Sequence, residues 1–308
     1  MEAAALDRKT IAADLNPYAV LLTEAKLARP NSLDEGLRRL REVWLFSRDL
    51  LPEHDLRSVP KWVRRFFHPK TLKSALAFRD ACIIRNDSFL LANLLGILHH
   101  QRPGFLSYPS SNLVPYLRDK KFPKESYPDL YKERSVLPRL EAKVRRTLKR
   151  IPARAPLSFS VRLCDAREFP LQQQVHAVIT SPPYMNGLDY IRDNRLRIWF
   201  LEKTNPSQVD LGKRDCEKKF EELLRQVARR VSRILVPGGY LAMVLGEVKR
   251  SGISRHTAAV ATRVLSEICL HNEYKLVKSY IDEIPQARRS RQEFTGCKSE
   301  VVLIYRRR

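Results

Sequence analysis

The stretch from Val175 to Tyr184, V-H-A-V-I-T-S-P-P-Y, constrains the fold more than any other part of the chain. Its first six residues are mostly apolar and β-branched, which predicts a strand over 175–180. The two prolines after Ser181 lack N–H groups and have a fixed φ, so the strand ends there and the backbone stays extended. Its carbonyl groups are then free to accept hydrogen bonds from a ligand. The Ser181–Tyr184 segment is either an amine-recognition site, with a hydroxyl in front and an aromatic ring behind, or a proline-rich turn.

Strands and helices alternate at both ends of the chain. Predicted strands cover residues 9–14, 157–163, 175–180, 240–245, 274–283 and 299–306. Predicted helices cover residues 17–29, 216–235 and 255–270. The long helix has an apolar face, formed by Phe220, Leu223, Val227, Val231 and Ile234, and Pro237-Gly238-Gly239 is the expected turn into the next strand. This order predicts an α/β fold with a doubly wound sheet.

Polar residues follow three of these strands. Asp14 ends the strand 9–14, Asp165 follows the strand 157–163, and Ser181 follows the strand 175–180. In open α/β sheets, ligands bind outside the carboxyl ends of the strands, so all three are candidate site residues. Asp14 is also a candidate helix cap, although Asn16 is better placed to cap a helix that begins at Pro17.

The middle of the chain, residues 31–150, predicts a helical and basic insertion. Ser32 and Glu35 form a capping box at its first helix, and residues 71–98 continue the helical pattern. Residues 102–133 contain five prolines among aromatic and basic side chains, which either contact a DNA backbone and unpaired bases or pack as a connection. A basic amphipathic helix closes the insertion, with an apolar stripe of Val136, Leu140, Val144 and Leu148.

The charge of the chain favours a polyanionic partner. Fifty-seven Lys and Arg residues against 34 Asp and Glu residues give a formal net charge of +23. A field of this sign attracts a phosphate backbone, although a ribosome-associated or membrane-surface protein can have the same composition. No membrane-spanning helix or signal peptide is expected, which predicts a cytoplasmic protein. The five cysteines form no paired pattern, so neither a metal site nor a disulfide framework is expected.

Several segments carry a resemblance to a known family. D-A-R-E-F-P at 165–170, T-S-P-P-Y at 180–184 and N-G-L-D-Y at 186–190 follow in the order seen in amino-methyltransferases. The chain resembles S-adenosylmethionine-dependent DNA methyltransferases of the cytosine-N4/adenine-N6 class. Residues 12–23, 237–240 and 296–305 add to the resemblance, which covers roughly the first 30 residues and residues 155–308.

The resemblance implies a fold, a cofactor and a reaction. The expected fold is a Rossmann-like methyltransferase sheet with an antiparallel last strand, formed by residues 1–30 and 151–308, with 31–150 as the target-recognition region. The cofactor is S-adenosyl-L-methionine and the substrate is double-stranded DNA. Serine before the two prolines favours cytosine N4, with adenine N6 or RNA as alternatives. The implied catalytic residues are Ser181, Pro182, Pro183 and Tyr184, and the implied cofactor-binding residues are Asp14, Asn16, Asp165, Ala166 and Thr180.

The chain departs from this family at one point. Family members have a glycine-rich loop between the first strand and the helix before the acidic second strand. Only thirteen residues precede Asp14, and no G-x-G occurs among the ten glycines. The first strand and its loop, which form one wall of the cofactor pocket, are therefore expected to be missing. The chain is then a fragment, an inactive copy, or one half of a split enzyme completed by a separate polypeptide that supplies the loop.

Overall fold

The structure is a computed structural model that describes residues 2–99, 105–111, 115–149, 158–169, 173–183, 190–202, 216–250, 253–269, 274–285 and 299–308. The chain forms two compact units. Unit 1 consists of Met1–Leu163 and Ile191–Ser207, and unit 2 consists of Cys164–Tyr190 and Gln208–Arg308. Each unit has its own hydrophobic core.

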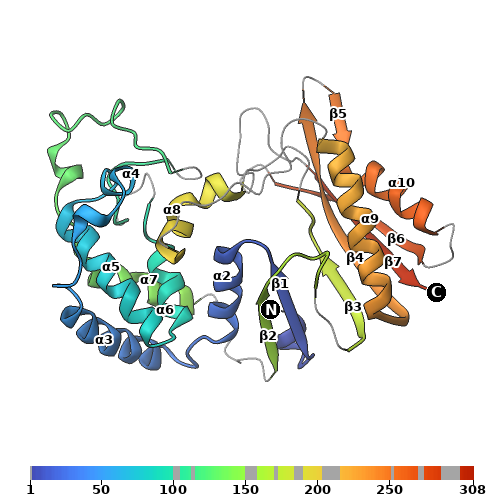
Figure 1. Ribbon diagram of the computed structural model, residues 1–308, viewed down its shortest axis with the longest axis horizontal. Coiled ribbons are helices and arrows are strands. Elements are labelled where there is room, and N and C mark those ends of the chain that lie inside the picture. Colours follow the sequence, from blue (N-terminus) through green and yellow to red (C-terminus); the bar gives the residue numbers. More distant parts are fainter. Residues whose placement is uncertain are drawn as a thin grey trace. The chain divides into compact units, whose positions relative to one another are not determined.

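The sheet of unit 1 has two parallel strands, β1 (Thr10–Asp14) and β2 (Phe159–Leu163). Thr10 pairs with Phe159 and Asp14 with Leu163, so both strands end level with each other. A short helix, α1 (Glu2–Ala5), precedes β1, and α2 (Pro17–Leu27) follows it (Figure 1). The predicted strands 9–14 and 157–163 and the predicted helix 17–29 are confirmed.

Most of unit 1 is helical. Its further helices are α3 (Leu33–Asp49), α4 (Lys61–Arg64), α5 (Pro69–Ile84), α6 (Ser88–Leu95), α7 (Val136–Leu148) and α8 (Tyr190–Glu202), with 3₁₀ turns at Leu56–Ser58 and Pro128–Tyr131. The start of α3 matches the predicted cap, because the Ser32 side chain accepts a hydrogen bond from the Glu35 N–H at 3.1 Å. The Glu35 carboxylate reaches back one residue further than a capping box requires, to the N–H of Asn31.

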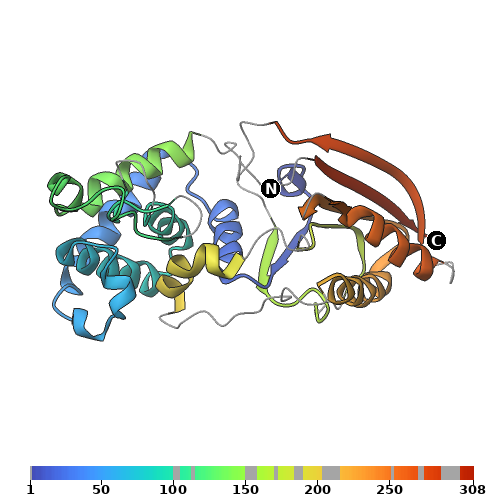
Figure 2. The same ribbon diagram turned by 90° about the horizontal axis from the view of Figure 1, so that it is seen from above.

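The core of unit 1 is formed where α3, α6 and α7 pack around α5 (Figure 2). Phe78 of α5 and Phe89 of α6 are buried. The predicted stripe on α7 is confirmed for Val136, Leu140 and Val144, which are buried, and Leu148 packs against the edge of the same core.

Unit 2 is built on a five-stranded mixed sheet. Its strands are β3 (Val175–Thr180), β4 (Leu235–Arg250), β5 (Ile253–His256), β6 (Tyr274–Glu283) and β7 (Ser299–Arg307). The order is β3-β4-β7-β6, and β5 pairs with the end of β4. β3 is parallel to β4, while β7 is antiparallel to both of its neighbours. The α/β class and the antiparallel last strand are confirmed.

Two helices of unit 2, α9 (Cys216–Ile234) and α10 (Thr257–Cys269), pack on each other and on β4 (Figure 1). The buried apolar residues of α9 are Phe220, Leu224, Ala228, Val231 and Ile234. Leu223 and Val227 of the predicted apolar face are only partly buried. The face that contacts the core is therefore rotated slightly from the predicted one.

The predicted turn Pro237-Gly238-Gly239 lies inside β4 as an irregularity of the strand. The register with β3 jumps from the pair Val175 and Leu235 to the pair Ala177 and Tyr240. Gly238 has φ of +78°, which favours glycine. A Cβ atom on Gly239 would lie 2.9 Å from the Val236 carbonyl oxygen and 3.0 Å from that of His176, so the close approach of β3 to β4 needs glycine here.

The described strands lie in two sheets, whereas a single doubly wound sheet was expected. Among the described residues, β1 pairs with β2 alone and β3 pairs with β4 alone. Periodicity predicted where the strands lie, but the pairing depends on which strands are available as neighbours. The assignment of catalytic and recognition roles to residues 1–30 with 151–308 and to 31–150 stays a prediction.

Candidate active site

Ser181 follows the last residue of β3 and is tied to the neighbouring strand. Its hydroxyl donates a hydrogen bond to the Val244 carbonyl of β4 at 3.2 Å. The residue before it, Thr180, pairs with Met243 of the same strand. A hydroxyl has one hydrogen and two lone pairs, so donation to Val244 leaves the oxygen able to accept. Since the Ser181 residue is exposed, this acceptor is available to an N–H group of a ligand.

Pro182 and Pro183 continue from Ser181 and are partly exposed. Neither has an N–H group, so both can offer only carbonyl oxygens. Tyr184, Asn186 and Asp189 lie outside the described residues. The three described residues of the Ser181–Tyr184 segment thus present acceptors at the carboxyl end of β3.

Asp165 is held by Arg167. The Arg167 guanidinium donates to the two Asp165 carboxylate oxygens at 2.9 and 2.6 Å, and the Arg167 N–H donates to the first of them at 2.8 Å. The side-chain hydrogen bond from Arg167 is the main reason why the pKa of Asp165 is lowered. This carboxylate is therefore ionised and oriented, and its remaining lone pairs can accept a further N–H. Ala166, between the two, is exposed.

Asp14 and Asn16 form a local chain of hydrogen bonds after β1. Asp14 Oδ1 accepts from the Asn16 N–H at 2.8 Å, and Asn16 Oδ1 accepts from the Tyr18 N–H at 2.9 Å. Asn16 is the N-cap of α2 and Asp14 is not. Among the described residues Asp14 Oδ2 has no hydrogen-bond partner, and the residue is exposed. It therefore has the free acceptor that a ribose diol requires.

The structure brings the predicted residues together in two groups. In unit 2, Ser181 contacts the Val244 carbonyl, and Thr180 lies beside it on the same strand. In unit 1, Asp14 contacts Asn16. Val244 was not predicted, because nothing in a sequence tells which distant carbonyl a serine will contact. The role of Arg167 had a local signal, since an arginine two residues after an aspartate can close such a turn.

The aromatic residues of 102–133 that the structure describes pack on each other and on arginines. The Tyr108 and Tyr131 ring centroids are 4.9 Å apart. Arg195 of α8 lies over the Trp62 and Tyr116 rings at 5.3 and 5.0 Å. Packing, one of the two alternatives for this segment, is therefore observed, and contact with nucleic acid stays a prediction.

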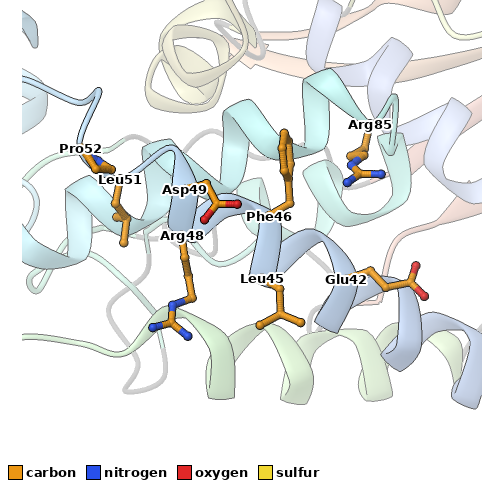
Figure 3. Close-up of a pocket in the computed structure, with 8 residues that line it drawn as sticks. All are labelled: Glu42, Leu45, Phe46, Arg48, Asp49, Leu51, Pro52 and Arg85. Atoms are coloured by element: carbon orange, nitrogen blue, oxygen red, sulfur yellow. The ribbon is translucent and has the colours of Figure 1, made fainter.

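A separate concave surface lies on unit 1 beside the C-terminal half of α3 (Figure 3). Arg85 stacks on Phe46 there at 4.6 Å, with Glu42, Leu45 and Arg48 around them. None of the predicted site residues lines this surface.

The described residues contain no group of three or more His, Cys, Asp and Glu side chains placed to hold a metal ion. Over the same residues, none of the helices combines the length and the apolarity needed to cross a membrane. Cys82 is buried, Cys164 is partly buried, and neither forms a disulfide.

No protein-family model and no curated protein matches this chain. Some solved structures are similar to parts of it. TTHA0409, a putative DNA modification methylase from Thermus thermophilus, is 24% identical over 46% of this chain and 51% of its own, with a TM-score of 0.30. TrmN from Thermus thermophilus is 14% identical over 56% of this chain and 33% of its own, with a TM-score of 0.29. The PvuII DNA methyltransferase (cytosine-N4-specific) is 13% identical over 46% of this chain and 45% of its own, with a TM-score of 0.29.

This chain spans about half the length of the first of these proteins and less of the other two.

Proposed function

We propose that this chain is the catalytic portion of a DNA methyltransferase that transfers a methyl group from S-adenosyl-L-methionine to the N4 amino group of cytosine. The observation behind the proposal is the placement of Ser181. Its hydroxyl donates a hydrogen bond to the Val244 carbonyl, which leaves its oxygen as an acceptor at the end of a strand. The resemblance of residues 180–184 to the amino-methyltransferase segment supports the same assignment.

Acceptors of this kind suit the chemistry of an exocyclic amino group. The nitrogen lone pair of cytosine N4 is delocalised into the ring, which makes the amine a poor nucleophile. The Ser181 oxygen and the Pro182 carbonyl accept its two N–H bonds, which favours a tetrahedral nitrogen with a localised lone pair. No covalent intermediate with the protein is needed, so proximity and orientation provide most of the rate. Tyr184 stacks on the base after it has left the duplex.

The candidate cofactor-binding residues suit the ribose and the adenine of the proposed cofactor. The free Asp14 oxygen matches the ribose hydroxyls, and the ionised Asp165 matches an amino group of the adenine. Asn16, Ala166 and Thr180 complete the proposed binding residues. When bound, this cofactor supplies an electrophilic methyl group on a sulfonium. No glycine-rich loop for its methionine portion occurs in the sequence. The proposed source of this loop is either a separate polypeptide or the rest of a longer chain of which this sequence is a fragment.

Double-stranded DNA is the proposed substrate. The formal net charge of +23 favours a phosphate backbone, and binding through such charges weakens steeply as the salt concentration rises. Residues 31–150 are the proposed recognition region, and the location is cytoplasmic. Transfer to adenine N6 or to RNA is the alternative reaction, and a nucleic-acid-binding fragment without activity is the alternative of another class.

The first test is calorimetric titration of the chain with S-adenosylmethionine, alone and with a peptide that carries a strand and a glycine-rich loop. Binding under either condition supports an enzyme, and binding only with the peptide supports a fragment or one half of a split enzyme. Absence of binding under both conditions would leave the inactive fragment as the better description. Competition among cytosine-containing duplexes, adenine-containing duplexes and RNA then separates the possible substrates.

A further inference from the structure

The concave surface beside the C-terminal half of α3 has an apolar lining. Leu45 is 60% exposed although it lies within a long helix, and Phe46 next to it is partly exposed. Leu51 and Pro52, which follow α3, continue the lining. A single exposed leucine is ordinary, but a group of exposed apolar side chains bordered by charged ones is typical of a binding surface.

The arginines at this surface lack acidic partners. Within the described part of the chain, none of Arg41, Arg48 and Arg85 forms an ion pair. Arg41, Leu45 and Arg48 are spaced i, i+4 and i+7, so they share one face of α3. Arg85 comes from the end of α5, and its guanidinium lies over the Phe46 ring at 4.6 Å (Figure 3). Stacking on a ring orients a guanidinium and leaves its N–H groups free to donate to a ligand.

Two carboxylates at the same surface favour a protein partner over a nucleic acid. Glu42 and Asp49 line it on either side of Leu45. Glu42 pairs with Arg38 at 2.8 Å, whereas Asp49 has no ion pair among the described residues. A phosphate backbone would meet charges of its own sign here, and it gains nothing from an apolar lining. Arginine and aromatic residues around an apolar centre are typical of protein interfaces. Because three unpaired arginines outnumber one unpaired aspartate, the surface favours an acidic partner.

We propose that this surface binds an acidic amphipathic helix of a partner protein. Apolar side chains three and four residues apart on that helix contact Leu45, Phe46 and Leu51, which is helix-in-groove recognition. Carboxylates beside the apolar stripe pair with Arg48 and Arg85, because a guanidinium can bind a carboxylate through two parallel hydrogen bonds. A helix suits a surface that runs along α3, since the side-chain ridges of one helix fit the grooves of another. Binding of this kind needs neither cofactor nor nucleic acid, so it is independent of the proposed function.

Fluorescence anisotropy with a labelled synthetic peptide and the full chain tests the proposal. The probe is a peptide of about 16 residues, with Leu at every third or fourth position and Glu on both sides of this stripe. A scrambled peptide of the same composition has the same charge without the stripe. Salt at about 0.15 M weakens attraction that depends on charge alone. We expect the amphipathic peptide to bind about tenfold or more tightly than the scrambled one, because only its apolar stripe matches the lining.

Two pairs of variants provide matched controls. Leu45→Ala removes the exposed apolar residue, and Leu6→Ala removes a leucine of similar exposure, 69%, outside this surface. Arg85→Glu reverses a charge at the surface, and Arg64→Glu makes the same change at an exposed residue of α4. We expect Leu45→Ala and Arg85→Glu each to weaken peptide binding by about tenfold. The Leu6 and Arg64 variants should bind as the unaltered chain does.

Several outcomes would overturn the proposal. Equal binding of the scrambled peptide would show attraction by charge alone, and unchanged binding by Leu45→Ala would place the peptide elsewhere. Absence of binding up to about 1 mM peptide, the weak end of measurable affinities, would show that the surface does not accept such a helix. A DNA duplex whose binding is weakened by Leu45→Ala would assign the surface to nucleic acid. Self-association of the chain that Leu45→Ala abolishes would assign it to a second copy.

Discussion

Ser181 and Val244 are 63 residues apart in the sequence, and the hydroxyl of Ser181 donates a hydrogen bond to the Val244 carbonyl at 3.2 Å. Without this bond the hydroxyl could turn its hydrogen toward a ligand and act as a donor. With it, the oxygen is presented as an acceptor before any ligand arrives. Such preorganisation is what recognition of an amino group requires.

The first prediction concerns this hydroxyl. Ser181→Ala should lower the rate of methyl transfer by about 10²–10³-fold, the usual effect of removing one preorganised polar group. Because Ser181 is exposed, the fold should not change. Single-turnover rates with radiolabelled cofactor measure the effect, with the fold checked by circular dichroism. Ser279→Ala, at an exposed position on β6, is the control and should keep the full rate. Full activity in Ser181→Ala would contradict the role given to this residue.

The second prediction concerns the pH dependence of the Asp165 and Arg167 pair. The pKa of Asp165 is lowered by the hydrogen bond from Arg167, so the pair stabilises the folded state above the ordinary pKa of an aspartate. This contribution is lost as the pH falls through the lowered pKa. Asp165→Asn should therefore destabilise unit 2 at neutral pH and have no effect at low pH. Since Arg167 is 45% exposed, the difference should stay below about 1 kcal/mol.

Hydrogen exchange of β3 and β4 at several pH values measures this difference. Glu168→Gln, which removes the neighbouring acidic group, is the control. A destabilisation by Asp165→Asn that is the same at every pH would show that the ion pair is not its cause.

The third prediction concerns Asp87 in unit 1. Its Oδ1 accepts from the Leu90 N–H at 2.9 Å and caps α6, while its Oδ2 accepts from Arg39 of α3 at 3.0 and 2.7 Å. The side chain is only 7% exposed. Asp87→Ala should lower the free energy of unfolding by about 2–4 kcal/mol, because it removes a cap and leaves Arg39 with only the more distant Glu35, at 3.9 Å. Asp87→Asn keeps the cap and should cost about half as much. Equal losses in the two variants would show that the cap contributes little.

The fourth prediction concerns the core of unit 1. Phe78 is fully buried, with its ring centroid 6.0 Å from that of Trp44. Phe78→Ala should lower the free energy of unfolding by about 3–5 kcal/mol through lost burial and the cavity left behind. All three tryptophans, Trp44, Trp62 and Trp199, belong to unit 1, so tryptophan fluorescence in urea follows this unit alone. Ile84→Ala on the same helix removes a side chain that is 61% exposed and should change the stability little.

Much of the fold could be predicted because it depends on local pattern. The strand at 175–180 was predicted with its observed bounds, and the stripe on α7 was predicted residue by residue. The prediction of the buried face of α9 was less accurate, because Leu224 and Ala228 are buried by neighbours that periodicity does not identify. The division of the strands into two sheets was not predicted, because pairing depends on the neighbours each edge finds.

In the candidate site, too, the features that depend on local pattern were predicted and those that depend on distant neighbours were not. Asn16 as a cap follows from its place before a proline, and it is confirmed. The partner of Ser181 depends on the register between β3 and β4, which includes a shift at the glycine irregularity. No local rule predicts such a shift. The catalytic and cofactor-binding roles of the predicted residues stay predictions.

The hydrogen bonds that run from Asp14 to Asn16 and from Asn16 to Tyr18 span only five consecutive residues. The direction in which the second Asp14 oxygen points is therefore determined within the segment D-L-N-P-Y. Insertions, deletions and repacking elsewhere in the chain can accumulate without disturbing it. The five residues set this geometry by themselves. Transferring them to another strand-to-helix junction should therefore transfer the exposed carboxylate oxygen as well.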